Sequence, residues 1–216
     1  MKTHPRTRPA RRWAALKPAA LLSAALVLLP ACTVLPKGET LVFYQLPEPQ
    51  AAVPRQPSPL PLSLRVATPR GNQLIDSERI LVAPRGDEIS AYKGARWSDS
   101  ATVLLRDRLV DAFRDSGGFR AVAAGGGQLH ADLELGGDLT AFQAQYVDGA
   151  PVVRLRLDAM LARAGSGTLL AARRFEASVP SQGKEVAQVV QAFGQAADTL
   201  AGQLVPWATQ RAAQAR

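Results

Sequence analysis

Residues 131–161 read ADLELGGDLTAFQAQYVDGAPVVRLRLDAML, and this stretch decides the fold. It contains two long runs of alternating apolar and polar side chains, separated by Asp148-Gly149, a pair typical of tight hairpin turns. A third alternating run, residues 174–179, follows a turn at 165–167. The alternation predicts an antiparallel meander with one buried and one solvated face. Gly136-Gly137 predicts a bulge or bend inside the first strand.

Two segments have the periodicity of amphipathic helices. Residues 98–115 place apolar side chains at three- and four-residue spacing, with Ser98 or Ser100 as the N-cap and Gly117-Gly118 after the end. Residues 184–205 carry a second apolar stripe, and the proline that follows predicts an end or a kink. We therefore predict an α+β fold in a single domain, with a mostly antiparallel sheet and two main helices packed on one face.

Shorter strands are expected before the meander, at residues 41–46, 62–66 and 79–83. The first two are separated by a stretch that is rich in proline, which disfavours helix and favours an extended backbone. We interpret this stretch as a linker.

The first 31 residues are typical of a bacterial secretion signal. They hold six of the 26 Lys and Arg residues and no acidic residue, and their apolar run at 19–29 is shorter than the roughly 20 residues of a membrane-spanning helix. Leu29 and Ala31 stand three residues and one residue before Cys32, as in a bacterial lipobox. We predict cleavage between Ala31 and Cys32 and acylation of Cys32, which anchors the chain in a membrane at about 0.8 kcal/mol per buried CH₂. The alternative is an ordinary cysteine beyond a simple secretory cleavage site.

These patterns divide the chain into four parts. Residues 1–31 are the signal peptide, and 32–61 are the lipidated N-terminus with a short strand and the proline-rich linker. Residues 62–207 form the folded domain, and 208–216 form a polar tail.

Composition argues against several classes of function. Without the signal peptide, 20 basic residues face 18 acidic ones, so we expect no nucleic-acid partner. One cysteine and two histidines cannot build a disulfide framework or a zinc site. The polar residues of the meander, His130, Asp132 and Glu134 among them, are expected on a solvated strand face. We therefore predict no catalytic residue, no cofactor and no metal, and a protein that is not an enzyme.

Several short segments, in this order and spacing, point to one known family. They are CTVLP at 32–36, FYQL at 43–46, RILV at 79–82, YKGARW at 92–97, SGGFRAV at 116–122, LTAFQA at 139–144 and RRF at 173–175. Together they resemble the ABC-type transport auxiliary lipoproteins, which include the paraquat-inducible lipoprotein associated with Mce-type transport.

The resemblance implies a non-catalytic domain that faces the periplasm of the cell envelope. It implies two partners, an Mce-domain protein and the subunits of an ABC transporter, which together move lipids or other hydrophobic molecules across the envelope. Thr33, rather than Asp, after the acylated residue favours the outer membrane. Self-association into a homo-oligomer stays open.

Trp97 stands at the start of the first predicted helix. It is our candidate for an exposed partner contact, and a buried position in the core is the alternative. Two other functions also stay open: an envelope lipoprotein that itself binds and carries a lipid, and an outer-membrane assembly factor.

Overall fold

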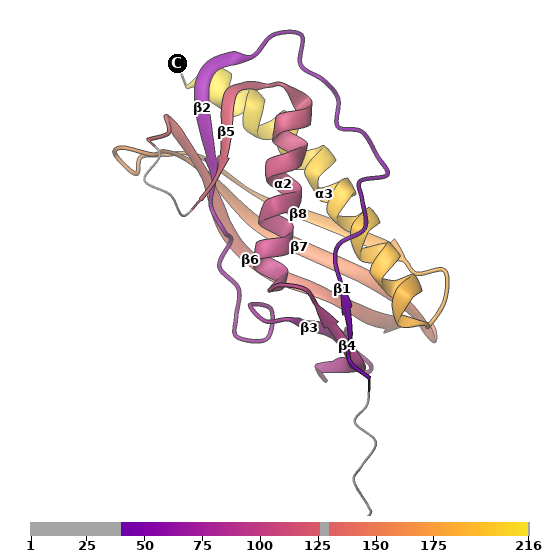
Figure 1. The fold of residues 1–216 in the computed structure, drawn as a ribbon. Coiled ribbons are helices and arrows are strands. Elements are labelled where there is room, and N and C mark those ends of the chain that lie inside the picture. Colours follow the sequence, from indigo (N-terminus) through magenta and orange to yellow (C-terminus); the bar gives the residue numbers. More distant parts are fainter. Residues whose placement is uncertain (1–39, 126–129, 216) are drawn as a thin grey trace, which may run out of the picture. The chain divides into compact units, whose positions relative to one another are not determined.

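The computed structural model describes residues 40–125 and 130–215 (Figure 1). Its strands are β1 (Val42–Tyr44), β2 (Leu60–Val66), β3 (Arg79–Ala83), β4 (Ser90–Trp97), β5 (Phe119–Ala124), β6 (Leu133–Val147), β7 (Ala150–Arg163) and β8 (Leu169–Pro180). Its helices are α2 (Ala101–Ser116) and α3 (Val186–Gln214). The predicted signal peptide, Ala31 and Cys32 lie outside the described residues.

The predicted meander is confirmed. β6, β7 and β8 pair antiparallel in chain order, and β6 turns into β7 at Asp148 and Gly149, whose φ angles are 50° and 79°. Apolar side chains of the three strands are buried on one face, while charged side chains occupy the other. The buried ones include Leu133, Leu135, Leu139, Phe142, Val153, Leu155, Leu157, Leu161 and Phe175.

The predicted irregularity in β6 is also present, and Gly137 explains it. This residue has a φ of 146°, and a Cβ atom on it would lie 2.1 Å from the carbonyl oxygen of Asp158 on β7. Only glycine allows this close approach of the two backbones. The register shifts shortly afterwards, between Leu139 and Ala141.

The prediction of a mostly antiparallel sheet is wrong, because the eight-stranded sheet is mixed. Four pairings are parallel: β1 with β4, β2 with β5, β2 with β6, and β3 with β6. Strand β6 is the reason. β6 has 15 residues and pairs with β7 along one of its edges. Its other edge is long enough to pair with two strands, β2 near Leu133 and β3 near Ala144. The connections around β6 include α2, and parallel pairing needs such long crossovers.

Both helices cover the same face of the sheet, as predicted (Figure 1). α2 packs against β5 and α3, whereas α3 packs against β7 and β8. Helix α2 begins after Ser100 and ends at Gly117, which adopts the left-handed conformation with a φ of 62°.

We predicted an end or a kink of the second helix at Pro206, and the end is wrong. α3 continues to Gln214, so residues 208–214 are helical and are not a polar tail. A proline ring normally collides with the carbonyl four residues earlier, so the helix needs support from other contacts to continue past this position. The turns beyond the proline are held by packing. The Trp207 ring lies 5.2 Å from the Phe175 ring of β8, and Ala212 is buried.

Candidate functional site

The proline-rich segment does not behave as the linker that we predicted. Residues 45–59, which we call the strap, run along the helices between β1 and β2 (Figure 1). The Gln56 N–H donates a 2.8 Å hydrogen bond to the Ser116 carbonyl at the end of α2, and Val53 packs against the core. Pro47 lies on α3 at Gly194, where a Cβ atom would come within 3.0 Å of the proline ring. The strap is therefore part of the folded domain.

A buried ion pair between the two helices fastens the strap. Arg108 of α2 donates to the Asp198 carboxylate of α3 and to the Pro47 carbonyl. The N–H of Gln50 donates a second bond to Asp198, at 2.9 Å. The side chains of Arg108 and Asp198 are only 7% and 5% exposed. A charge pair buried this deeply is maintained only where further hydrogen bonds satisfy it, and the strap backbone supplies them.

Sequence reasoning missed this clamp, although a signal for it exists. Arg108 was counted among the polar residues around the first helix, yet it lies four residues after Leu104 and four before Ala112, on the apolar stripe. Asp198 is the only acidic residue between 186 and 214. A charge on the buried stripe of each helix is the pattern that predicts a buried pair.

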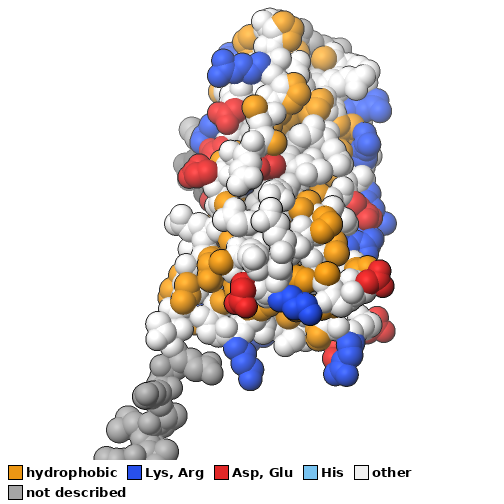
Figure 2. Space-filling view, turned by 90° about the vertical axis from the view of Figure 1, so that its right-hand side faces the viewer, with side chains coloured by type: hydrophobic (Ala, Val, Ile, Leu, Met, Phe, Trp, Pro, Cys, Tyr) orange, Lys and Arg blue, Asp and Glu red, His pale blue; other side chains and the backbone are white. Residues whose placement is uncertain are grey.

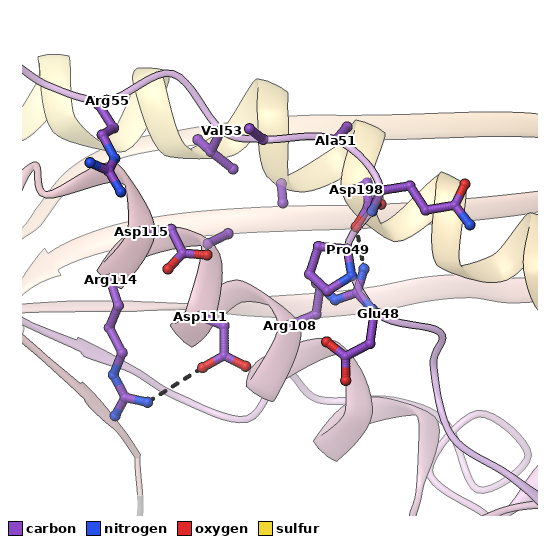
Figure 3. A pocket seen from close by; sticks show the side chains of 14 residues that line it. Glu48, Pro49, Ala51, Val53, Arg55, Arg108, Asp111, Arg114, Asp115 and Asp198 are labelled. Carbon is purple, nitrogen blue, oxygen red and sulfur yellow. Dashed lines mark hydrogen bonds and ion pairs between the residues drawn. The ribbon is translucent and has the colours of Figure 1, made fainter.

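A pocket of about 670 Å³ opens between the strap and the helices (Figure 3). Its apolar part is made by small side chains, and charged groups surround them. The lining residues are Glu48, Pro49, Gln50, Ala51, Ala52, Val53, Arg55, Arg108, Asp111, Ala112, Arg114, Asp115, Asp198 and Ala201. Charges of both signs in an open pocket suit a polar protein segment, whereas an acyl chain prefers a mostly apolar lining.

The solvated face of the meander carries charges that neutralise one another. Arg174 donates to Asp158 at 2.6 Å, and Arg154 and Arg156 lie 3.1 and 2.7 Å from Glu176. The hydrogen bond from Arg174 lowers the pKa of Asp158, and those from Arg154 and Arg156 lower the pKa of Glu176. These arginines are therefore engaged within the sheet, as expected for cross-strand pairs.

The carboxylates of Asp132 and Glu134, which we expected on a solvated strand face, are engaged as well. Asp132 accepts hydrogen bonds from the Ser63 N–H and hydroxyl, both at 2.7 Å, and these bonds lower its pKa. Glu134 forms an ion pair with Arg65, and His130 is exposed. Among residues 40–125 and 130–215, His, Asp and Glu side chains nowhere form a group that could hold a metal ion.

Trp97 corrects our prediction of an exposed partner contact. The side chain is fully buried, with its ring 5.1 Å from the Phe193 ring and 5.9 Å from the Phe142 ring, both edge-on. These aromatic contacts join β4, β6 and α3. Trp97 is a core residue, and we withdraw it as a contact.

Comparison with known proteins places this fold and sequence in one family. The family model of the ABC-type transport auxiliary lipoprotein component matches residues 44–205. A crystal structure of a protein from Xanthomonas campestris has 32% identical sequence and a TM-score of 0.72, over 81% of this chain and 98% of that chain. A second crystal structure, of an uncharacterised protein, is 19% identical with a TM-score of 0.60, over 78% of this chain and 99% of that chain, and it supports the fold alone.

An uncharacterised protein of Bradyrhizobium diazoefficiens is 29% identical over 166 residues, which are 77% of this chain. Those residues make up 44% of that protein, so the chain spans less than half the length of this relative. No helix in the described part of the chain is long and apolar enough to cross a membrane. The family match extends from the end of β1 to the turn of α3 before Pro206, and the chain therefore belongs to the ABC-type transport auxiliary lipoprotein components.

Proposed function

We propose that this protein is a lipid-anchored, non-catalytic component of an ABC/Mce-type system that moves lipids or other hydrophobic molecules across the cell envelope. It acts by docking onto the Mce-domain protein and the transporter subunits. Cys32 carries the anchor, in the outer membrane, and the folded domain faces the periplasm. The observation that carries the proposal is the family match over residues 44–205.

The structure supports a docking role more than a carrier role. The strap, clamped by Arg108 and Asp198, holds α2, α3 and the segment that follows β1 together. The pocket beside it has a charged lining, which suits a protein surface. A lipid carrier would instead need a large, mostly apolar cavity.

Substitution of the anchor residue tests this proposal. We expect Cys32→Ser to leave the domain folded, with unchanged circular dichroism, but to release it from the membrane and to abolish transport-dependent growth or lipid homeostasis in the host. Ala31→Gly, which keeps a small residue before the cleavage site, is the matched control and retains function. A fully active Cys32→Ser protein that fractionates with soluble periplasmic proteins would contradict the proposal.

A further inference from the structure

Large apolar side chains are exposed mainly at one end of the domain. Seven of them are substantially exposed in the described residues: Leu41, Val42, Phe43, Leu74, Ile89, Val147 and Leu169. Scattered single residues of this kind need no explanation, but a group of them marks an interaction surface. Their positions in the sheet show whether these seven side chains are scattered or form a group.

Sheet topology brings five of the seven to the same end. β1 runs parallel to β4, β4 runs antiparallel to β3, and β3 runs parallel to β6. The first residues of β4 therefore lie at the end where β3 and β6 finish. β1 pairs with the last three residues of β4, from Ala95 to Trp97, and its first residue is the one nearer that end. We call this surface the apolar end, and it consists of Leu41, Val42, Phe43, Ile89 and Val147. Figure 2 shows hydrophobic side chains gathered beside the point where the described chain begins.

β1 is an edge strand of three residues, and within the described residues it pairs with β4 only. Phe43 on this strand is 59% exposed, the highest value among the seven side chains. Edge strands are normally protected by charged side chains or by a covering segment. Here the sequence places three consecutive large apolar residues on the edge instead, which indicates that another surface covers them.

The chain itself indicates which surface this is. Leu41 follows Cys32 by nine residues, and nine residues span at most about 32 Å when fully extended. Once Cys32 is acylated, Leu41 cannot move farther than this from the membrane that holds the anchor. The apolar end is therefore the part of the domain that is confined near the lipid surface.

Charges at this end are nearly balanced, so they do not by themselves attract the domain to anionic lipids. The charged residues around the apolar end are the basic Arg79, Arg85, Lys93, Arg96 and Lys184 and the acidic Glu78, Asp87, Glu88, Asp99, Asp148 and Glu185, of which only Arg96 is half-buried. A contact made by the apolar side chains is expected to depend little on salt.

We propose that the apolar end is a membrane-contact surface, on which Leu41, Phe43 and Ile89 enter the headgroup region of the bilayer that holds the anchor. This inference rests on the acylation of Cys32 in the proposed function. The contact adds a second attachment beside the acyl chains and orients the domain, with the opposite end of the meander pointing away from the membrane.

Site-specific labelling of the full lipoprotein tests the contact. Because Cys32 is the only cysteine, an introduced cysteine is the only free thiol once Cys32 is acylated. We would label Phe43→Cys and Ile89→Cys with a polarity-sensitive fluorophore and reconstitute each protein in vesicles of phosphatidylethanolamine and phosphatidylglycerol. Leu169→Cys is the matched control: Leu169 is 56% exposed, close to the value for Phe43, and lies at the start of β8, at the opposite end of the meander.

We expect the fluorophore at positions 43 and 89 to emit at shorter wavelength and more strongly in the vesicles than the same fluorophore does in water. Lipids that carry a quencher in the headgroup should reduce this emission. Neither change is expected at position 169. Equal responses at 43 and 169 would overturn the inference. A response at 43 that disappears when the protein-to-lipid ratio is lowered would assign the surface to a second copy and would overturn it as well. Label uptake by the wild-type protein would show a free Cys32 and remove the basis of the inference.

The vesicles contain no transport proteins, so this result is independent of partner docking. Labels that stay in water, together with intact partner capture, would refute the membrane contact and leave the proposed function standing. Labels that enter the bilayer, together with a failure to capture partners, would support the membrane contact and refute the proposed function.

Discussion

Arg108 of α2 and Asp198 of α3 form a buried ion pair whose remaining hydrogen bonds go to the backbone of the strap, at Pro47 and Gln50. The ion pair joins residues that lie 90 positions apart in the sequence, and its further hydrogen bonds fasten both helices to the segment between β1 and β2. The clamp explains why a proline-rich stretch, which has few backbone donors of its own, lies in a fixed position on the domain.

Removal of one charge from the clamp is expected to be strongly destabilising. Asp198→Ala leaves the Arg108 guanidinium buried without its partner, which costs about 3–5 kcal/mol in the free energy of unfolding. Asp111→Ala is the matched control, because the Asp111–Arg114 pair on α2 is exposed, and we expect it to cost less than about 1 kcal/mol. Urea unfolding of the 40–216 domain measures both.

A double variant separates the charge pair from its packing. In Arg108→Met with Asp198→Leu, the unpaired charge is gone and the volume is partly restored, so we expect recovery of part of the stability lost by Asp198→Ala. Proteolysis within the strap should still become faster, because Pro47 and Gln50 lose their partners. A double variant no more stable than Asp198→Ala would contradict this account of the clamp.

Gly137 and its neighbour Gly136 provide a matched pair of tests. Gly137→Ala would place a methyl group 2.1 Å from the Asp158 carbonyl at a positive φ, whereas on Gly136 the nearest atom would be 3.7 Å away. We expect Gly137→Ala to lower the free energy of unfolding by about 3 kcal/mol or more, and Gly136→Ala to change it by less than about 1 kcal/mol. Thermal unfolding followed by circular dichroism distinguishes them, and equal effects would be inconsistent with the close approach of β6 and β7.

Much of the fold could be predicted from local patterns. β6, β7, β8 and α2 have strict two-residue or 3.6-residue periodicity over many residues, and their turns carry Gly at the positions that need it. α2 lies within three residues of its predicted bounds, whereas β8 begins at Leu169, five residues before the predicted run. Local pattern alone determines such elements, because each buries one regular face.

The remaining elements depend on contacts between distant residues. β4 was not predicted as a strand, because Gly94 with a φ of 66° interrupts the alternation, and β5 is a short run of small residues. Parallel pairing of β2 and β3 with β6 leaves no local trace in the sequence. Beyond Pro206, α3 is held by packing such as that of Trp207 on Phe175, a contact that cannot be derived from either segment alone.

The burial of Trp97 makes a prediction for the core. Trp97→Ala removes a fully buried ring from its contacts with Phe142 and Phe193, and we expect a loss of about 3–5 kcal/mol in unfolding free energy. Trp97→Phe retains much of the packing and removes a buried indole N–H that has no hydrogen-bond acceptor among the described residues, so its cost is expected to be smaller. Chemical denaturation measures both variants. Trp97→Ala with wild-type stability and impaired partner capture would restore the partner-contact interpretation.

The ion pairs on the solvated face predict how stability depends on pH. Hydrogen bonds from Arg174 lower the pKa of Asp158 in the folded state, and those from Arg154 and Arg156 lower the pKa of Glu176. Groups with a lowered folded-state pKa stabilise the fold above their unfolded pKa, about 4, and lose this effect as the pH falls through the folded-state value. We expect the urea midpoint to fall as the pH decreases below about 4.

The variant Asp158→Asn tests how much of the stability lost at low pH is due to the Asp158 carboxylate. It should have a lower midpoint than the wild type at pH 7 and a shallower decrease below pH 4, since one of the titrating groups is gone. A difference between the two proteins that stays constant from pH 7 to pH 2 would argue against a role of the Asp158 carboxylate in acid stability.

The most direct test of the account is capture of partners by the full lipoprotein from crosslinked, detergent-solubilised envelopes, read by mass spectrometry, with the Cys32→Ser protein as the control. We expect the wild-type protein to recover an Mce-domain protein together with ABC transporter subunits, and the control to lose them. Recovery of outer-membrane assembly factors in their place, or equal recovery by both proteins, would contradict a lipid-anchored docking role in ABC/Mce-type transport.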